Sequence, residues 1–150
     1  MKLLVHSNAP TTRTGYGVQT ALLVERLAAD GHEVAVSATY GHGANCGMGT
    51  WTTPRGDRVQ VLPHFARVSG DDVLVAHAQH WFGAEGDGWV IPLLDVWSLM
   101  EPDIAKLNIA AWAPVDHDPV PPAVARFFTR DNRAQVTTGR LQQFRVEIGR

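Results

Sequence analysis

The first 40 residues constrain the fold most, because they predict a strand, a helix and a second strand in close succession. Residues 2–6 (KLLVH) form a short apolar run that stops at a polar, proline-containing loop, as strands do. Apolar residues between Val18 and Ala28 recur at helical spacing and end at Asp30-Gly31, a typical helix terminus. The segment His32–Ala38 alternates polar and apolar residues, which indicates a strand. The chain therefore begins with a parallel β-α-β unit.

The rest of the chain continues this alternation of strands and helices. We expect strands at residues 59–62, 73–76, 89–97, 108–113 and 135–138, helices at 121–129 and 141–148, and an extended loop at 40–58 with a short hairpin around 50–53. Such an order predicts a Rossmann-like α/β fold, with an open, mostly parallel sheet and helices on both faces. Ligands of these folds bind beyond the carboxyl ends of the strands.

Composition limits the domain count and the partners. A chain of 150 residues, 45% of them hydrophobic, can bury one core but is too short for two ordinary domains, so we expect residues 1–150 to form one domain. The 13 basic and 15 acidic residues give a formal charge of -2, which does not favour nucleic acid as a partner. No transmembrane segment is expected, because Pro92 and Asp95 interrupt the most apolar stretch, residues 89–100.

The cellular location is expected to be cytoplasmic. The single cysteine, Cys46, cannot form a disulfide within the chain, and the apolar run at the start is too short for a secretory signal. One cysteine and histidines without a recognised ligand spacing also give no reason to expect a metal or another cofactor.

The loop after the first strand is a candidate anion site. Gly15, Tyr16 and Gly17 stand where the helix begins, and glycines there let a ligand approach the free N–H groups at the helix start. Thr20 occupies the position of the third glycine in the dinucleotide fingerprint, which argues against a nicotinamide cofactor. The alternative is a simple tight turn with a glycine at the helix cap.

Other polar residues follow the predicted strands. Arg13 could pair with a phosphate, and Asn8 lies on the same loop. His77, His80 and Trp81 come after the strand predicted at residues 73–76 and could hold a sugar by hydrogen bonds and stacking. The histidines could equally be structural.

A third group, Asp116-His117-Asp118, follows the strand predicted at residues 108–113. Prolines on both sides restrict this loop and can hold its side chains in place: Pro114, Pro119, Pro121 and Pro122. His117 could donate a hydrogen bond to a sugar hydroxyl or accept one from it, and Asp116 could fix the tautomer of the His117 ring. The alternative is an aspartate helix cap beside a surface histidine.

Taken in order, these motifs resemble the amino-terminal, acceptor-side domain of family 4 retaining glycosyltransferases with the GT-B fold. The resemblance rests on T-G-Y-G before the helix, G-H-E-V at the second strand, D-D-V-L-V-A-H-A-Q-H-W, and A-W-A-P-V-D-H-D-P-V-P-P, and it covers nearly the whole chain. It implies transfer of a sugar from a nucleotide diphosphate sugar to an acceptor, with retention of configuration and without a metal. It also implies that the loop Gly15–Gly17 faces the donor diphosphate and that His117 lies near the transferred sugar.

The chain also departs from that family. Family members continue into a second Rossmann domain that holds most of the donor, and that donor-binding domain is absent from these 150 residues. Gly139 stands where such proteins often have a serine. The chain is then a fragment, the partner of a separate donor domain, or a protein without catalysis. The competing hypothesis is a non-catalytic Rossmann module that binds a sugar phosphate or nucleotide, or that forms a homodimer through the surface that a second domain would cover.

Overall fold

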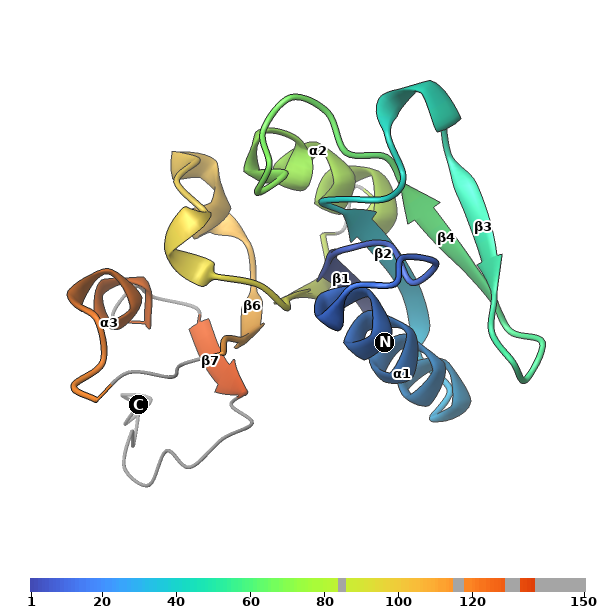
Figure 1. The fold of residues 1–150 in the computed structure, drawn as a ribbon, viewed down its shortest axis with the longest axis horizontal. Coiled ribbons are helices and arrows are strands. Elements are labelled where there is room, and N and C mark those ends of the chain that lie inside the picture. Colours follow the sequence, from blue (N-terminus) through green and yellow to red (C-terminus); the bar gives the residue numbers. More distant parts are fainter. Residues whose placement is uncertain (84–85, 115–117, 129–132, 137–150) are drawn as a thin grey trace.

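The computed structural model describes residues 1–83, 86–114, 118–128 and 133–136 and contains one seven-stranded sheet (Figure 1). The strands are β1 (Lys2–Ser7), β2 (Glu33–Ala38), β3 (Gly49–Thr52), β4 (Arg58–Leu62), β5 (Gly88–Pro92), β6 (Ile109–Trp112) and β7 (Arg133–Val136). The α-helices are α1 (Gly15–Ala29), α2 (Asp71–Phe82) and α3 (Pro122–Phe128), and short 3-10 helices are η1 (Ala44–Cys46), η2 (Val96–Ser98) and η3 (Pro102–Lys106).

The sheet has the order β3-β4-β2-β1-β5-β6-β7, with the β3–β4 hairpin at one end and β7 at the other (Figure 1). The β3–β4 pair is antiparallel, and the other neighbouring pairs are parallel. Without the hairpin strand β3, the order is that of a doubly wound sheet, so the predicted Rossmann-like α/β fold is confirmed. In this order the chain changes direction across the sheet between β1 and β5, where doubly wound folds bind their ligands.

Successive residues of β1 supply the cores on the two faces of the sheet. Leu3 and Val5 pack with Val24 of α1 on one face. Leu4 packs with Leu74 of α2 on the other, where α3 adds Val124 and Phe127. Helices therefore cover both faces, as the sequence predicts, and the central strand is buried on both.

The strand predicted at residues 73–76 is wrong, because these residues belong to helix α2. Within α2 the buried positions Leu74, Ala78 and Phe82 recur every four residues, which is the spacing of one helix face. Gly70 precedes the helix with a φ of 65°, and Asp71 begins it. Residues 73–76 are four consecutive apolar residues, and a run of this length is typical of a buried strand as well as of part of a buried helix.

The other predicted elements agree with the structure more closely. The hairpin predicted around residues 50–53 is confirmed as β3 with β4. The strand predicted at 89–97 ends at Pro92, and residues 96–98 form η2 instead. The last strand is found at Arg133–Val136, and the helix predicted at 141–148 lies outside the described residues. Within the described part, none of the helices has the length and apolar character needed to cross a bilayer.

The helical assignment of residues 73–76 can be tested by two substitutions in α2. Leu74 is fully buried, so Leu74→Ala should lower the free energy of unfolding by about 2 to 5 kcal/mol. Ala76 is exposed, so Ala76→Ser should change it by less than about 0.5 kcal/mol. Urea unfolding followed by circular dichroism measures both, and equal losses at the two positions would contradict the helix.

Candidate functional site

The loop between β1 and α1 is held by a chain of side-chain hydrogen bonds. Thr14 caps α1 by accepting from the Gly17 N–H at 3.0 Å. The Asn8 amide donates to the Thr14 hydroxyl at 2.9 Å and accepts from the Thr39 hydroxyl at 2.8 Å. Thr39 directly follows β2, so the ends of two neighbouring strands and the start of α1 are joined by side chains. This network fixes the position of the helix start.

The loop between β1 and α1 together with the first turn of α1 is called the glycine loop, and its two glycines, Gly15 and Gly17, have different roles. A Cβ on Gly17 would lie 2.5 Å from the carbonyl oxygen of Thr12, so the close packing of loop against helix requires glycine there. A Cβ on Gly15 would meet nothing within 4 Å, so packing against the described residues does not require glycine there. Gly15 is exposed, and no acceptor for its N–H is found among the described residues. The open space is at Gly15.

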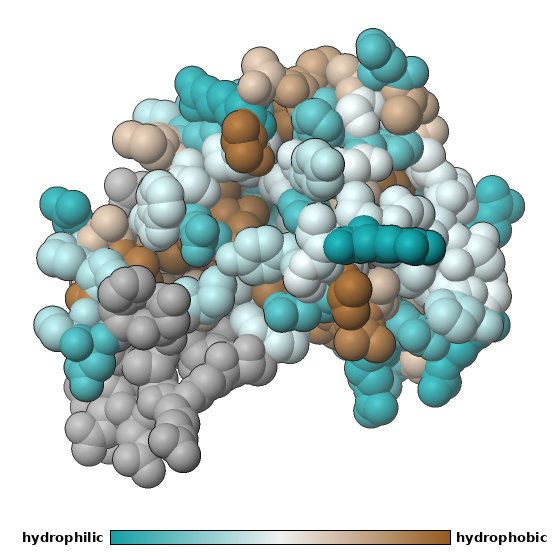
Figure 2. All heavy atoms as spheres, viewed as in Figure 1, coloured by the Kyte–Doolittle hydropathy of each residue, from teal (hydrophilic) through white to brown (hydrophobic). Residues whose placement is uncertain are grey.

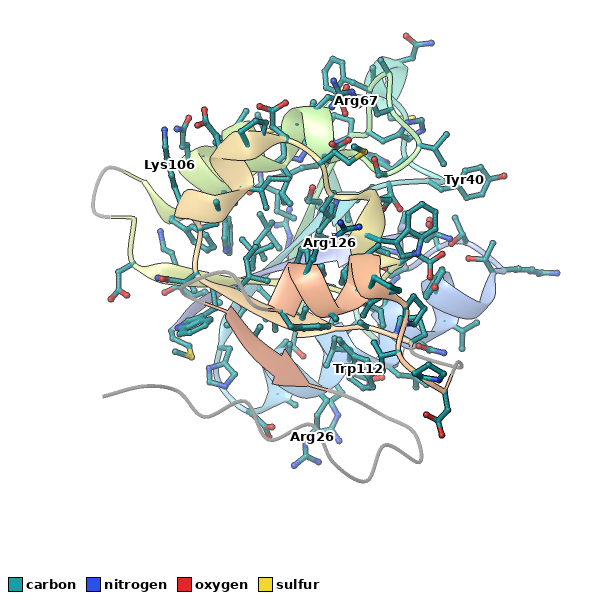
Figure 3. The ribbon with its side chains drawn as sticks, turned by 90° about the vertical axis from the view of Figure 1, so that its left-hand side faces the viewer. Arg26, Tyr40, Arg67, Lys106, Trp112 and Arg126 are labelled. Carbon is teal, nitrogen blue, oxygen red and sulfur yellow. The ribbon has the colours of Figure 1, made fainter. Side chains whose placement is uncertain are left out.

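A cleft of about 1060 Å³ opens at the carboxyl edge of the sheet, next to this loop. Its lining comes from the segments that follow β1, β2, β4 and β5 and from the start of α1 and α2: Asn8, Tyr16, Thr39, Tyr40, Ala66, Arg67, Val68, Ser69, Asp71, Leu94, Asp95, Trp97, Ser98, Met100, Glu101 and Pro102. In Figure 3, Tyr40 and Arg67 lie toward one end of the molecule, and Arg26 in the last turn of α1 lies toward the other. The cleft is where a doubly wound sheet binds ligands.

Asp71 joins two walls of this cleft. Its buried carboxylate accepts from the N–H groups of Met100 and Glu101 at 3.1 and 3.2 Å. It also accepts from the Ser69 hydroxyl at 2.7 Å and from the Arg67 guanidinium at 3.1 Å. Burial acts to raise the pKa of Asp71, but the hydrogen bonds from Ser69 and Met100 and the charge of Arg67 hold it below its ordinary value of 3.8. The start of α2 and the segment before η3 are therefore tied to one ionised side chain.

Two histidines and a serine form a buried chain of hydrogen bonds behind the cleft. His6 Nε2 lies 2.7 Å from the Ser69 carbonyl, which can only accept, so Nε2 carries the proton. His6 Nδ1 then accepts from the Ser37 hydroxyl at 2.9 Å, and the Ser37 oxygen accepts from His77 Nδ1 at 2.8 Å. Burial lowers the pKa of His6 and of His77 from 6.5 to about 4, so both rings are neutral near pH 7.

The structure brings only some of the predicted site residues together. Asn8 and Tyr16 line the cleft, and Gly15 and Gly17 lie in the adjoining first turn of α1. Arg13 is exposed on that loop. Asp116 and His117 lie outside the described residues.

The predicted acceptor residues of α2 lie away from the cleft. His77 is buried against Ser37. His80 is exposed in the last turn of α2, and the carbonyl of Trp81 accepts from Lys2 Nζ at 3.1 Å. Because Lys2 begins β1, Trp81 lies at the amino edge of the sheet, opposite the glycine loop. These residues lie elsewhere than expected because α2 runs from the carboxyl edge of the sheet back to its amino edge, whereas a parallel strand would end at the carboxyl edge.

Sequence reasoning missed Thr39, Asp71 and Trp97. Thr39 could have been found, because it follows a predicted strand just as Asn8 does. Asp71 and Trp97 give no local signal, since both line the cleft from turns whose sequences predict a strand or its flank. Among the described residues, no group of three or more His, Cys, Asp and Glu side chains is placed to hold a metal ion.

Comparison of the chain with protein-family models, with curated proteins and with solved structures finds no match.

The buried histidines should make stability depend on pH. The unfolded chain takes up protons below about pH 6.5, whereas the folded His6 and His77 resist them until about pH 4, so stability falls as the pH drops through this window. For His6 the slope is at most about 1.4 kcal/mol per pH unit, and His77, which lies closer to solvent, adds less. Urea unfolding at pH 7.0 and pH 5.0 measures this change in the free energy of unfolding. His77→Asn should reduce the slope, and equal stability at both pH values would exclude the effect.

The two glycines should respond in opposite ways to alanine. Gly17→Ala should lower the free energy of unfolding by about 1 to 3 kcal/mol, because the loop backbone at Thr12 must shift. Gly15→Ala should leave it unchanged or raise it by up to about 1 kcal/mol, because there is space and alanine favours the helix. Thermal unfolding of the pair tests the difference, and a loss at Gly15 as large as at Gly17 would contradict it.

Proposed function

We propose that this chain is the acceptor-side half of a sugar transferase that takes a sugar from a nucleotide diphosphate sugar and transfers it with retention of configuration. The observation that carries the proposal is that the glycine loop and the large cleft share one edge of the sheet. They are joined through Asn8, which lines the cleft and donates to Thr14, the cap of α1, at 2.9 Å. Two substrates bound at these places would be neighbours, as a transfer reaction requires.

The start of α1 would hold the donor diphosphate. The N–H of Gly15 and the positive end of the helix dipole suit an anion, and they would also stabilise the charge that develops on the leaving diphosphate. The free space at Gly15 supports this role, because glycine there is explained by the approach of a ligand and not by packing. The exposed Arg13 would add a positive charge on the same loop.

The acceptor would occupy the cleft. Tyr16 belongs to the helix start and also lines the cleft, so it would lie between donor and acceptor. Asn8 keeps its proposed place in the acceptor site, and Thr39, which also lines the cleft, is added to it. The proposal no longer includes His77, His80 and Trp81, because they do not line the cleft. His117 and Asp116 remain the proposed contacts to the transferred sugar. Transfer itself would also need a donor-binding domain, with the cleft closed between the two domains.

The proposal predicts that nucleotide diphosphate sugars bind the chain at Gly15. Isothermal titration with UDP-glucose, GDP-mannose and the free nucleotides should detect binding that Gly15→Asp weakens at least about tenfold, because its carboxylate repels the diphosphate. The variant should stay folded, since an acidic residue suits a helix start. Gln19→Glu, which adds the same charge to an exposed position one turn further along α1, should bind like the parent chain.

The other possible outcomes of this titration would contradict the proposed donor site or favour the competing hypothesis. If the parent chain binds none of these compounds, or if Gly15→Asp binds as well as the parent, the proposed donor site is wrong. If the free nucleotides bind but their sugars are excluded, the competing hypothesis of a non-catalytic nucleotide module is favoured instead.

A further inference from the structure

The cleft has two walls of different chemistry. Asn8, Tyr16 and Thr39, on the side of the glycine loop, offer polar groups. The segment after β5 presents apolar surface on the other side, where Trp97 is 56% exposed and Met100 is 77% exposed. Hydrophobic side chains, drawn in brown, also reach the surface between hydrophilic ones on the face in Figure 2. An indole left open to solvent inside a cleft can stack on a planar or apolar ligand.

The charges that line the cleft are mostly negative. Its ionisable side chains are the carboxylates of Asp71, Asp95 and Glu101 and the guanidinium of Arg67, which leaves an excess of two negative charges. Arg67 lies 3.1 Å from Asp71 and 3.9 Å from Glu101, so its positive charge is already engaged. The lining therefore repels an anion and attracts a cation.

Asp95 and Trp97 both line the cleft and belong to one short turn. The backbone carbonyl of Asp95 accepts from the N–H and the hydroxyl of Ser98 at 2.9 and 2.7 Å, which fixes the turn of η2 that carries Trp97. The Asp95 side chain is exposed, and the described residues offer it no ion pair. An exposed carboxylate and an exposed indole that line the same cleft suit a ligand with an ammonium group and an aromatic or apolar body.

We infer that the cleft binds a hydroxylated acceptor that carries an amine and an apolar or aromatic body, and that it excludes acceptors with a phosphate or carboxylate. The use of this ligand as an acceptor rests on the proposed function, but its binding does not. Trp97 stacks on the apolar body, Asp95 and Glu101 face the ammonium group, and a hydroxyl of the ligand points to Asn8 and Thr39, toward the glycine loop.

Three small phenols that differ mainly in charge test this inference: tyramine, 4-hydroxyphenylethanol and 4-hydroxyphenylacetate. In an NMR titration of the ¹⁵N-labelled chain, tyramine should bind most tightly and 4-hydroxyphenylacetate at least about fivefold more weakly. High salt should reduce the difference in affinity between tyramine and 4-hydroxyphenylacetate, because salt screens the charge of the carboxylates. The perturbed indole signal should be the one that disappears in Trp97→Ala.

Variants separate the two parts of the site. Trp97→Ala should weaken all three ligands, whereas Asp95→Asn should reduce only the preference for tyramine. Asp103→Asn is the matched control, since Asp103 is exposed, pairs with Lys106 at 2.8 Å and does not line the cleft. The spectra of all variants also report that they are folded.

The results distinguish this inference from the proposed function. Absence of binding, tighter binding of 4-hydroxyphenylacetate, or binding that Trp97→Ala does not change would overturn the inference, whatever the nucleotide sugars do. If the phenols bind in the expected order and the nucleotide sugars do not bind, the cleft has the inferred preference, and the proposed transferase is wrong.

Discussion

The parallel pairing of β1 with β2 on one side and with β5 on the other is the constraint on which the rest of the structure depends. It sets Lys2 opposite both Glu33 and Gly88, so the three strands start and end at matching levels. The residues that follow them consequently meet at one edge of the sheet, where Asn8 bonds to Thr39 and the cleft opens. The same register places His6 beside Ser37 within the sheet. The site is thus built by strand pairing over segments that are distant in the sequence.

The sequence predicts the fold class and most elements because their signals are local. The periodicity of α1, its glycine stop and the alternation in β2 lie within a few turns of chain, and neighbouring residues are enough to recognise them. Helix α2 was missed because its apolar run at residues 73–76 has no period of its own, and only the packing of Leu74, Ala78 and Phe82 shows which face is buried. The glycine loop could be located from its place after β1. The cleft could not be located from the sequence, because Arg67, Trp97 and Met100 lie far from the glycine loop along the chain and only the folded sheet brings them to it.

The hydrogen-bonded set His6, Ser37 and His77 shows how a polar motif can belong to the core. The sequence predicts a ligand contact for His77, and in the structure its ring links α2 to β2 through Ser37, which in turn bonds to His6, the partner of the Ser69 carbonyl. Buried polar groups must find partners, and a set in which each proton has one acceptor admits few other arrangements. This set therefore helps to fix the position of α2 on the sheet. The apolar contacts of Leu74 and Ala78 also contribute, but they do not determine that position alone.

Asp71 is linked to the cleft wall through two partners, Met100 and Glu101, that offer it only their backbone N–H groups. A side-chain partner changes when its residue is substituted, but every amino acid except proline supplies the same peptide N–H. The link between α2 and the cleft wall consequently tolerates any residue other than proline at positions 100 and 101, but it depends on the side chain of residue 71. The apolar wall can thus be rebuilt for another ligand by changing Met100 or Trp97, while the frame that holds it stays in place.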